Sequence, residues 1–105
     1  MQTYKKYCGE TAEIDVAGVT AVNIVDSIKG LDYTMLVIMA GTRPVTFTIL
    51  DNDSSTPTMT GTFKGPFTIK AGKSMEVSIS PALAVFAIND SGDETTSKVK
   101  VWAYS

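Results

Sequence analysis

The sequence predicts an all-β fold: a single-domain β-sandwich over residues 1–105, with a jelly-roll-like arrangement of strands. The chain contains 14 threonines and 10 valines, and both residue types favour strands. Apolar and polar residues alternate in several short segments, as expected for strands with one face in a core. Gly, Pro, Asn and Asp recur between these segments, which predicts about seven to nine strands at intervals of about 8 to 12 residues. An immunoglobulin-like sandwich is the alternative, although the chain lacks the Cys-Trp-Cys arrangement of that fold.

The first half of the chain alternates less regularly than the second. Residues 13–16 alternate between acidic and apolar side chains and indicate an early strand. Residues 19–28 allow two interpretations. The spacing of their apolar residues fits a short helix between Thr20 and Gly30, whereas their many β-branched residues favour a strand, which is the prediction here. Residues 33–40 form the most hydrophobic predicted strand, and the turn at residues 41–44 follows it.

The second half alternates more clearly. Strands are predicted at residues 45–50, 58–63, 67–70, 75–80, 83–88 and 97–104. Residues 64–66, Lys-Gly-Pro, are expected to interrupt the sheet because proline cannot donate a hydrogen bond to a neighbouring strand. Residues 83–88 are almost all apolar, which predicts a strand covered on both faces. The methionines of the predicted strands, Met35, Met39, Met59 and Met75, are expected to fill gaps in the core.

The composition argues against several classes of function. Eleven acidic and nine basic residues are interspersed and give a net charge of −2, so no nucleic-acid partner is expected. Histidine is absent, and the single cysteine, Cys8, is interpreted as a small buried apolar residue. We therefore predict no catalytic residue, no metal site, no cofactor and no enzymatic activity. The absence of an internal disulfide fits folding in a reducing cytoplasm.

No membrane association is predicted either. No apolar segment follows Lys5 and Lys6 as it would in a secretory signal, and the longest apolar run, at residues 35–40, is far shorter than the roughly 20 residues of a membrane-spanning helix. The expectation is a soluble chain.

Two acidic segments, at residues 51–55 and 89–94, offer carboxylates that could hold a calcium ion. Neither has the ligand spacing of an EF-hand loop, and Asn and Asp are common in tight turns because their side chains bond to nearby backbone. Turns are therefore the prediction, and ion binding stays open.

The last predicted strand carries the candidate site. Lys98, Lys100, Trp102 and Tyr104 alternate with apolar residues and should share one face. Trp and Tyr are enriched in protein interfaces, so we predict an interface at these four residues. Packing of Trp102 beneath a loop and stacking against a carbohydrate are the alternatives. Residues 4–7, Tyr-Lys-Lys-Tyr, repeat the combination and are expected to extend the same surface.

Two segments carry a resemblance to a protein family. The final strand, KVKVWAY at residues 98–104, and the strand-turn-strand unit FTIKAGKSMEVSI at residues 67–79 resemble minor virion proteins of tailed bacteriophages. This resemblance implies a capsid decoration or head-fibre-base protein that folds in the host cytoplasm and then joins the virion. The implied partners are further copies of the chain, often as a trimer, and a capsid protein. The alternative is a small carbohydrate-binding module that uses Trp102 and Tyr104, or a protein that stays in the cytoplasm.

Overall fold

The computed structural model describes residues 10–28, 33–50, 64–79 and 84–104. Within these ranges the chain forms eight β-strands: β1 Glu10–Val16, β2 Val22–Asn23, β3 Met35–Ala40, β4 Val45–Ile49, β5 Lys64–Ile69, β6 Ser74–Ser78, β7 Val85–Asn89 and β8 Ser97–Tyr104. The prediction of an all-β fold is confirmed. The predicted turn at 51–55, the predicted strand at 58–63, Cys8, Met59 and residues 4–7 lie outside the described residues. No helix in the described ranges has the length and apolar character needed to cross a membrane.

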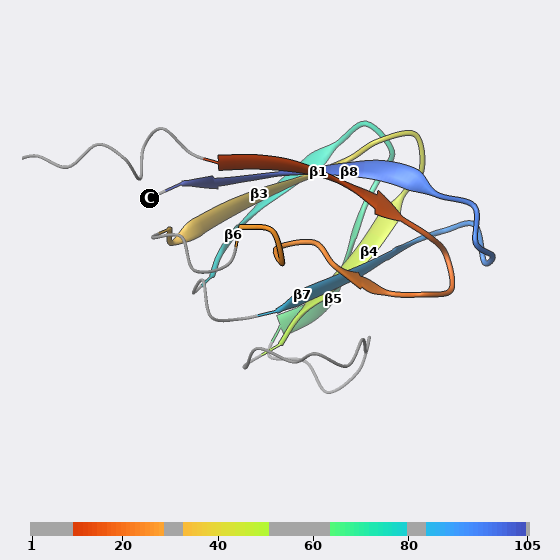
Figure 1. Ribbon diagram of the computed structural model, residues 1–105, viewed down its shortest axis with the longest axis horizontal. Helices are drawn as coiled ribbons and strands as arrows, with labels where there is room; N and C mark the ends of the chain where they lie inside the picture. The colour runs from red at the N-terminus through yellow and green to blue at the C-terminus, as the bar shows by residue number, and fades with distance from the viewer. Residues whose placement is uncertain (1–9, 29–32, 51–63, 80–83, 105) are drawn as a thin grey trace, which may run out of the picture.

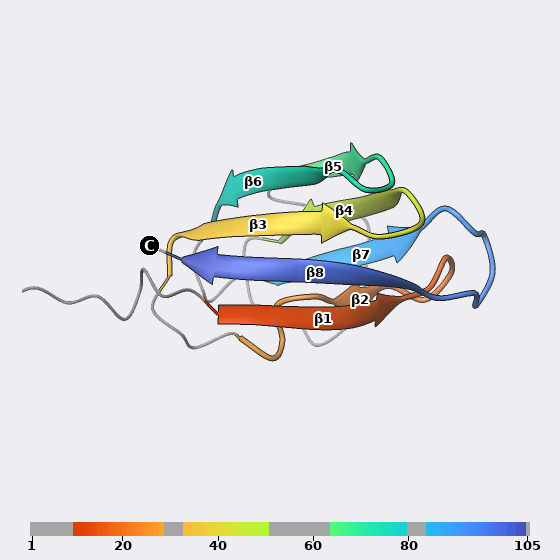
Figure 2. The ribbon, with the colours of Figure 1, turned by 90° about the horizontal axis from the view of Figure 1, so that it is seen from above.

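The strands form two antiparallel sheets packed face to face (Figures 1 and 2). One sheet has the order β1-β8-β3-β6 and the other the order β2-β7-β4-β5. The pairs β1–β8, β2–β7, β3–β6 and β4–β5 are nested along the chain and alternate between the sheets. Such nesting is the eight-stranded jelly roll, which combines two Greek keys. The jelly-roll prediction is therefore confirmed, and the immunoglobulin-like alternative is wrong because its strands divide between the sheets in another order.

The main core lies between the two sheets. Strand β8 shows how the sequence builds it: Val99, Val101 and Ala103 are buried, and the residues between them are on the other side of the strand. Successive side chains of a strand point to opposite faces, so a strict alternation places one half of β8 in the core and the other half outside. Strand β3 contributes Leu36 and Ile38 to the same core.

Strand β7 is buried on both faces, as predicted for residues 83–88. Val85 and Ala87 belong to the main core, and Phe86 packs with Leu50 and Ala84 in a smaller cluster. The second sheet is thus covered on its outer side at Phe86, which is only 2% exposed. The outer side can be apolar at Phe86 because Leu50 and Ala84 pack against it, while the opposite sheet covers Val85 and Ala87 on the inner side.

Residues 19–28 form neither the predicted strand nor the alternative helix. Only Val22–Asn23 is a strand, and tight turns follow it at residues 24–28. The side-chain oxygen of Asn23 accepts hydrogen bonds from the backbone N–H groups of Val25, at 3.2 Å, and Val85, at 3.3 Å. Side-chain bonding of this kind competes with regular secondary structure. Ile24, Val25 and Ile28 still reach the core, so their apolar spacing reflects burial through turns.

The predicted interruption at residues 64–66 does not end the strand. Strand β5 runs through Gly65 and Pro66, although its pairing with β4 is irregular there. It is an edge strand, and its register with β4 shifts between Phe47 and Ile49, next to the proline. Proline is tolerated at edges and irregular pairings because no donor is needed on the open side. Gly65 has a φ of 103°, a conformation that favours glycine.

Candidate interaction surface

All four predicted interface residues lie on the outward side of β8, in the middle of the sheet β1-β8-β3-β6 (Figure 2). We call this outward side the β8 face. The strand pairing places neighbours on both sides of each β8 residue: Trp102 pairs with Thr11 of β1 and Val37 of β3. The residues of the β8 face are Thr11, Glu13, Asp15, Lys98, Lys100, Trp102, Tyr104, Met35, Val37, Met39, Ser74, Glu76 and Ser78.

One end of the β8 face is charged. Lys98 pairs with Asp15 across the strands, with 2.6 Å between Nζ and Oδ1. The hydrogen bond and the negative charge of Asp15 raise the pKa of Lys98, and Glu13 adds a smaller contribution. Lys100 lies opposite Glu13 in the register and is exposed, but it has no ion-pair partner among the residues described. Exposed ion pairs add little stability, so these charges matter chiefly for what can approach the surface.

The other end is aromatic. The rings of Trp102 and Tyr104 are 5.1 Å apart between centroids and inclined by 31°. The hydroxyl of Tyr104 donates a hydrogen bond to the carboxylate of Glu76 on β6, across the intervening strand β3. Trp102 is 39% exposed and belongs to no core cluster. The indole is therefore held in place by the tyrosine and remains open to a partner.

The centre of the β8 face is apolar, a feature that the sequence analysis missed. Met35 and Met39 were expected in the core, but both are half-buried on the β8 face beside Val37. Met75 does pack against the core, as predicted. The uninterrupted apolar run of β3 could have predicted this. Alternate residues of a strand point to opposite faces, so if Leu36 and Ile38 lie in the core, the apolar residues between them must lie on the outer face.

A shallow depression of about 310 Å³ lies at the charged end of the β8 face. Its polar lining includes Glu13, Lys73, Lys98 and Lys100, with Met39 as an apolar element. Because Asp15 pairs with Lys98, Lys73 and Lys100 against Glu13 leave only a small excess of positive charge at this end.

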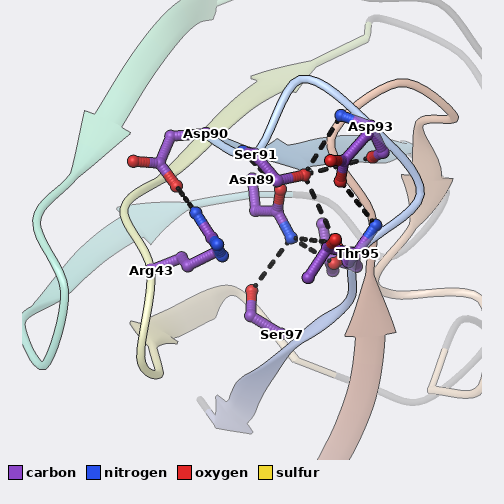
Figure 3. Close-up of polar contacts among 8 residues, drawn as sticks. Arg43, Asn89, Asp90, Ser91, Asp93, Thr95 and Ser97 are labelled. Carbon is purple, nitrogen blue, oxygen red and sulfur yellow. Dashed lines mark hydrogen bonds and ion pairs between the residues drawn. The ribbon is translucent and has the colours of Figure 1, made fainter.

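The acidic segment at residues 89–94 is a structural turn (Figure 3). Asp90 pairs with Arg43 at 3.1 Å, and Asp93 accepts a hydrogen bond from the backbone N–H of Thr95 at 2.8 Å. Within the described ranges no group of three His, Cys, Asp or Glu residues could hold a metal ion. The carboxylates of this loop thus have protein partners, in the turn itself for Asp93 and on neighbouring segments for Asp90 and Glu94. The segment at 51–55 lies outside the described residues.

The hydrogen bonds of Asp93 are expected to make the folded state less stable at acid pH. Hydrogen bonds from the side chain and backbone of Thr95, and from Ser91, hold the pKa of Asp93 below its usual value of 3.8. A carboxyl whose pKa is lower in the folded state stabilises fully above its unfolded pKa, and that stabilisation is lost as the pH falls through the folded value. We expect wild type to melt above the Asp93→Asn variant at pH 7 and the difference to be smaller at about pH 2. A difference in melting temperature that is the same at both pH values would contradict this role for the Asp93 charge.

The fold and the surface define a class: a jelly roll with one sheet face that is apolar at its centre, partly aromatic and, as far as the described residues go, uncovered. No family model and no curated protein matches the chain. Among solved structures, the coat protein of Tobacco streak virus is similar to it, with 11% sequence identity and a TM-score of 0.42. The likeness covers 100% of this chain and 90% of that chain.

Proposed function

We propose that the chain is a non-enzymatic structural subunit of a virion, of the capsid-decoration kind, which docks through the β8 face. The observation that carries this proposal is the apolar centre of that face. Trp102 and Tyr104 lie beside Met35, Val37 and Met39, surrounded by charged and hydroxyl side chains. Contiguous exposed apolar surface with a polar rim is typical of protein interaction sites, because its burial releases water.

The architecture supports the same role. The jelly roll is used by viral capsid domains, but also by lectins and cupins, so the fold by itself is only an analogy. A docking subunit needs a rigid scaffold and one adhesive surface. The nested strand pairs supply the scaffold, and β8, which has neighbours on both sides, holds Trp102 and Tyr104 firmly on it. The partners in this proposal are further copies of the chain and a capsid protein, after folding in the host cytoplasm.

Carbohydrate binding by Trp102 and Tyr104 is the rival function. A sugar-binding platform would offer a flat ring face and a free hydroxyl for hydrogen bonding. Here the two rings are inclined by 31°, and the Tyr104 hydroxyl is engaged by Glu76. These features favour a protein partner, for which an irregular apolar surface is suitable.

The proposed virion role predicts that the chain sediments as part of a large particle. A tagged chain made in its own host should travel in fast-sedimenting particles on a sucrose gradient, because a virion component is held in a large assembly. A second sample on a glycan array should show no binding. Recovery only at the size of a small free protein would contradict the virion role, and saturable glycan binding would favour the carbohydrate-binding rival.

A further inference from the structure

The order of side chains along β8 identifies an occupant for the β8 face. We infer that this face binds a second copy of the same chain, related by a two-fold axis that crosses β8 between Lys100 and Trp102. The inference rests on the proposed docking role of the face and goes beyond it by naming the partner and the register. In this arrangement Lys100 of each copy lies over the partner's Trp102.

The outward residues of β8 are basic in the first half of the strand and aromatic in the second. The axis lies in the plane between the two faces and is perpendicular to β8. It reverses the direction of β8 in the second copy, so the basic half of β8 in one copy meets the aromatic half of β8 in the other. A two-fold interface must be self-complementary, and β8 has this property. An ammonium over an indole ring is a favourable cation–π contact. Sheets that pack face to face cross at about 30°, which displaces side chains near the axis very little, so the Lys100 and Trp102 pairs stay opposed.

The flanking strands fit the same axis. On β3, Val37 meets the partner's Met39, which places apolar groups together. On β1, Thr11 meets the partner's Glu13, a hydroxyl opposite a carboxylate. On β6, Glu76 would lie against a serine of the second copy. Near the axis, no two like charges oppose each other. An axis parallel to the strands at the centre of the sheet, between β8 and β3, would instead place Lys100 over the partner's Met39, where the ammonium has no acceptor.

Lys100 is available for this contact and Lys98 is not. The ammonium of Lys98 is held by Asp15 at 2.6 Å. Lys100 lacks an ion-pair partner within the described residues, and its side chain is exposed. The indole of Trp102 contacts the ring of Tyr104 and keeps 39% of its surface exposed. Within the part of the chain that the structure describes, the Lys100 ammonium thus has no ion-pair partner and the Trp102 indole is partly exposed.

The size of the face sets the expected strength. Four strands about 4.8 Å apart and about six residues long make a face of roughly 20 Å by 20 Å, so contact would bury on the order of 800 Å² in total. This is below the area of most stable complexes. A dimer of micromolar affinity is therefore expected, which would be reinforced when several contacts act together in an assembly.

Sedimentation velocity over a concentration series, from about 1 to 500 µM, tests the inference. Wild type should shift reversibly from monomer to dimer. Lys100→Glu should weaken the dimer about tenfold or more, because each dimer loses two cation–π contacts. Lys70→Glu makes the same charge change at an exposed lysine outside the β8 face and should leave the dimer unchanged. Equal effects of the two substitutions would overturn the register and indicate a response to net charge alone.

A mixing experiment tests the two-fold relation directly. Lys100→Glu and Trp102→Lys should each self-associate poorly, since the first opposes a carboxylate to an indole and the second opposes two ammonium groups. Mixed together they should associate, because the new carboxylate meets the new ammonium while the native pair remains on the other side of the axis. No rescue on mixing would overturn the axis. Should Trp102→Lys fail to fold, the comparison of Lys100→Glu with Lys70→Glu still decides the register.

The outcomes separate this inference from the proposed function. A wild-type chain that remains monomeric at the highest concentration but sediments with large particles would overturn the second copy as partner and leave virion docking intact. Dimerisation that is insensitive to both Lys100→Glu and Trp102→Lys would overturn the inference and also remove the β8 face as the contact.

Discussion

Replacement of Trp102 by alanine is expected to weaken association through the β8 face by about 2 kcal/mol or more, while the monomer stays folded. The indole is the largest exposed apolar side chain of the β8 face, and it sits next to Tyr104 and Val37 near the centre. Buried aromatic residues at the centre of an interface contribute most to its affinity. The fold should tolerate the change because Trp102 lies outside the core clusters. Sedimentation of the purified variant, and its incorporation into particles, measure the loss.

Val19→Ala is the matched control for this substitution. Val19 is 57% exposed and lies outside the β8 face, so the substitution removes a large exposed apolar side chain without affecting the contact.

Trp102 is the only tryptophan, and its fluorescence reports this site directly. Association should shift the emission to shorter wavelength and protect it from quenchers. An alanine variant that unfolds would assign Trp102 a structural role. A folded variant that associates as tightly as wild type, with quencher-accessible tryptophan emission in the native assembly, would show that the proposed surface is wrong.

Replacement of Asn89 by alanine is expected to produce a large loss of stability, about 3 kcal/mol, or a decrease in melting temperature of roughly 12–24 °C. The Asn89 side chain is only 4% exposed and donates hydrogen bonds to the carbonyl groups of Val16, at 2.7 Å, and Thr95, at 2.8 Å (Figure 3). Its oxygen accepts a hydrogen bond from the backbone N–H of Ser91 at 2.9 Å. Alanine leaves these backbone groups without their partner, and unsatisfied buried polar groups are costly.

Asp90→Ala, at the next residue, is the control. Asp90 makes an exposed ion pair with Arg43, and loss of such a pair should change the free energy of unfolding by no more than about 0.5 kcal/mol. The comparison, by thermal and urea unfolding, separates the buried hydrogen bonds of Asn89 from the general effect of altering the loop. Similar stabilities of the two variants would mean that Asn89 does not connect β1, β7 and β8 as the structure indicates.

The sequence alone determined the features that follow from the alternation of apolar and polar residues within a single strand. The predicted strand at residues 97–104 has the same bounds as β8, and its alternation placed Lys98, Lys100, Trp102 and Tyr104 on one face. Side chains of a strand alternate whatever their neighbours are, so this grouping needs no tertiary information. The all-β class and the number of strands follow from the same alternation and from the intervening turn residues. The jelly-roll arrangement agreed with that strand number.

Only the tertiary structure decided which strands are central and what lies beside each residue. Pro66 is tolerated because β5 is at an edge, and a strand's place in the sheet is not written in its own sequence. The apolar run of β3 has no period, so nothing local distinguishes Leu36 in the core from Met35 on the β8 face. Long-range register also decided that Asp15 neutralises Lys98 while Lys100 stays unpaired among the described residues. Pairing depends on the packing of residues more than 80 positions apart, and local preference carries no information about it.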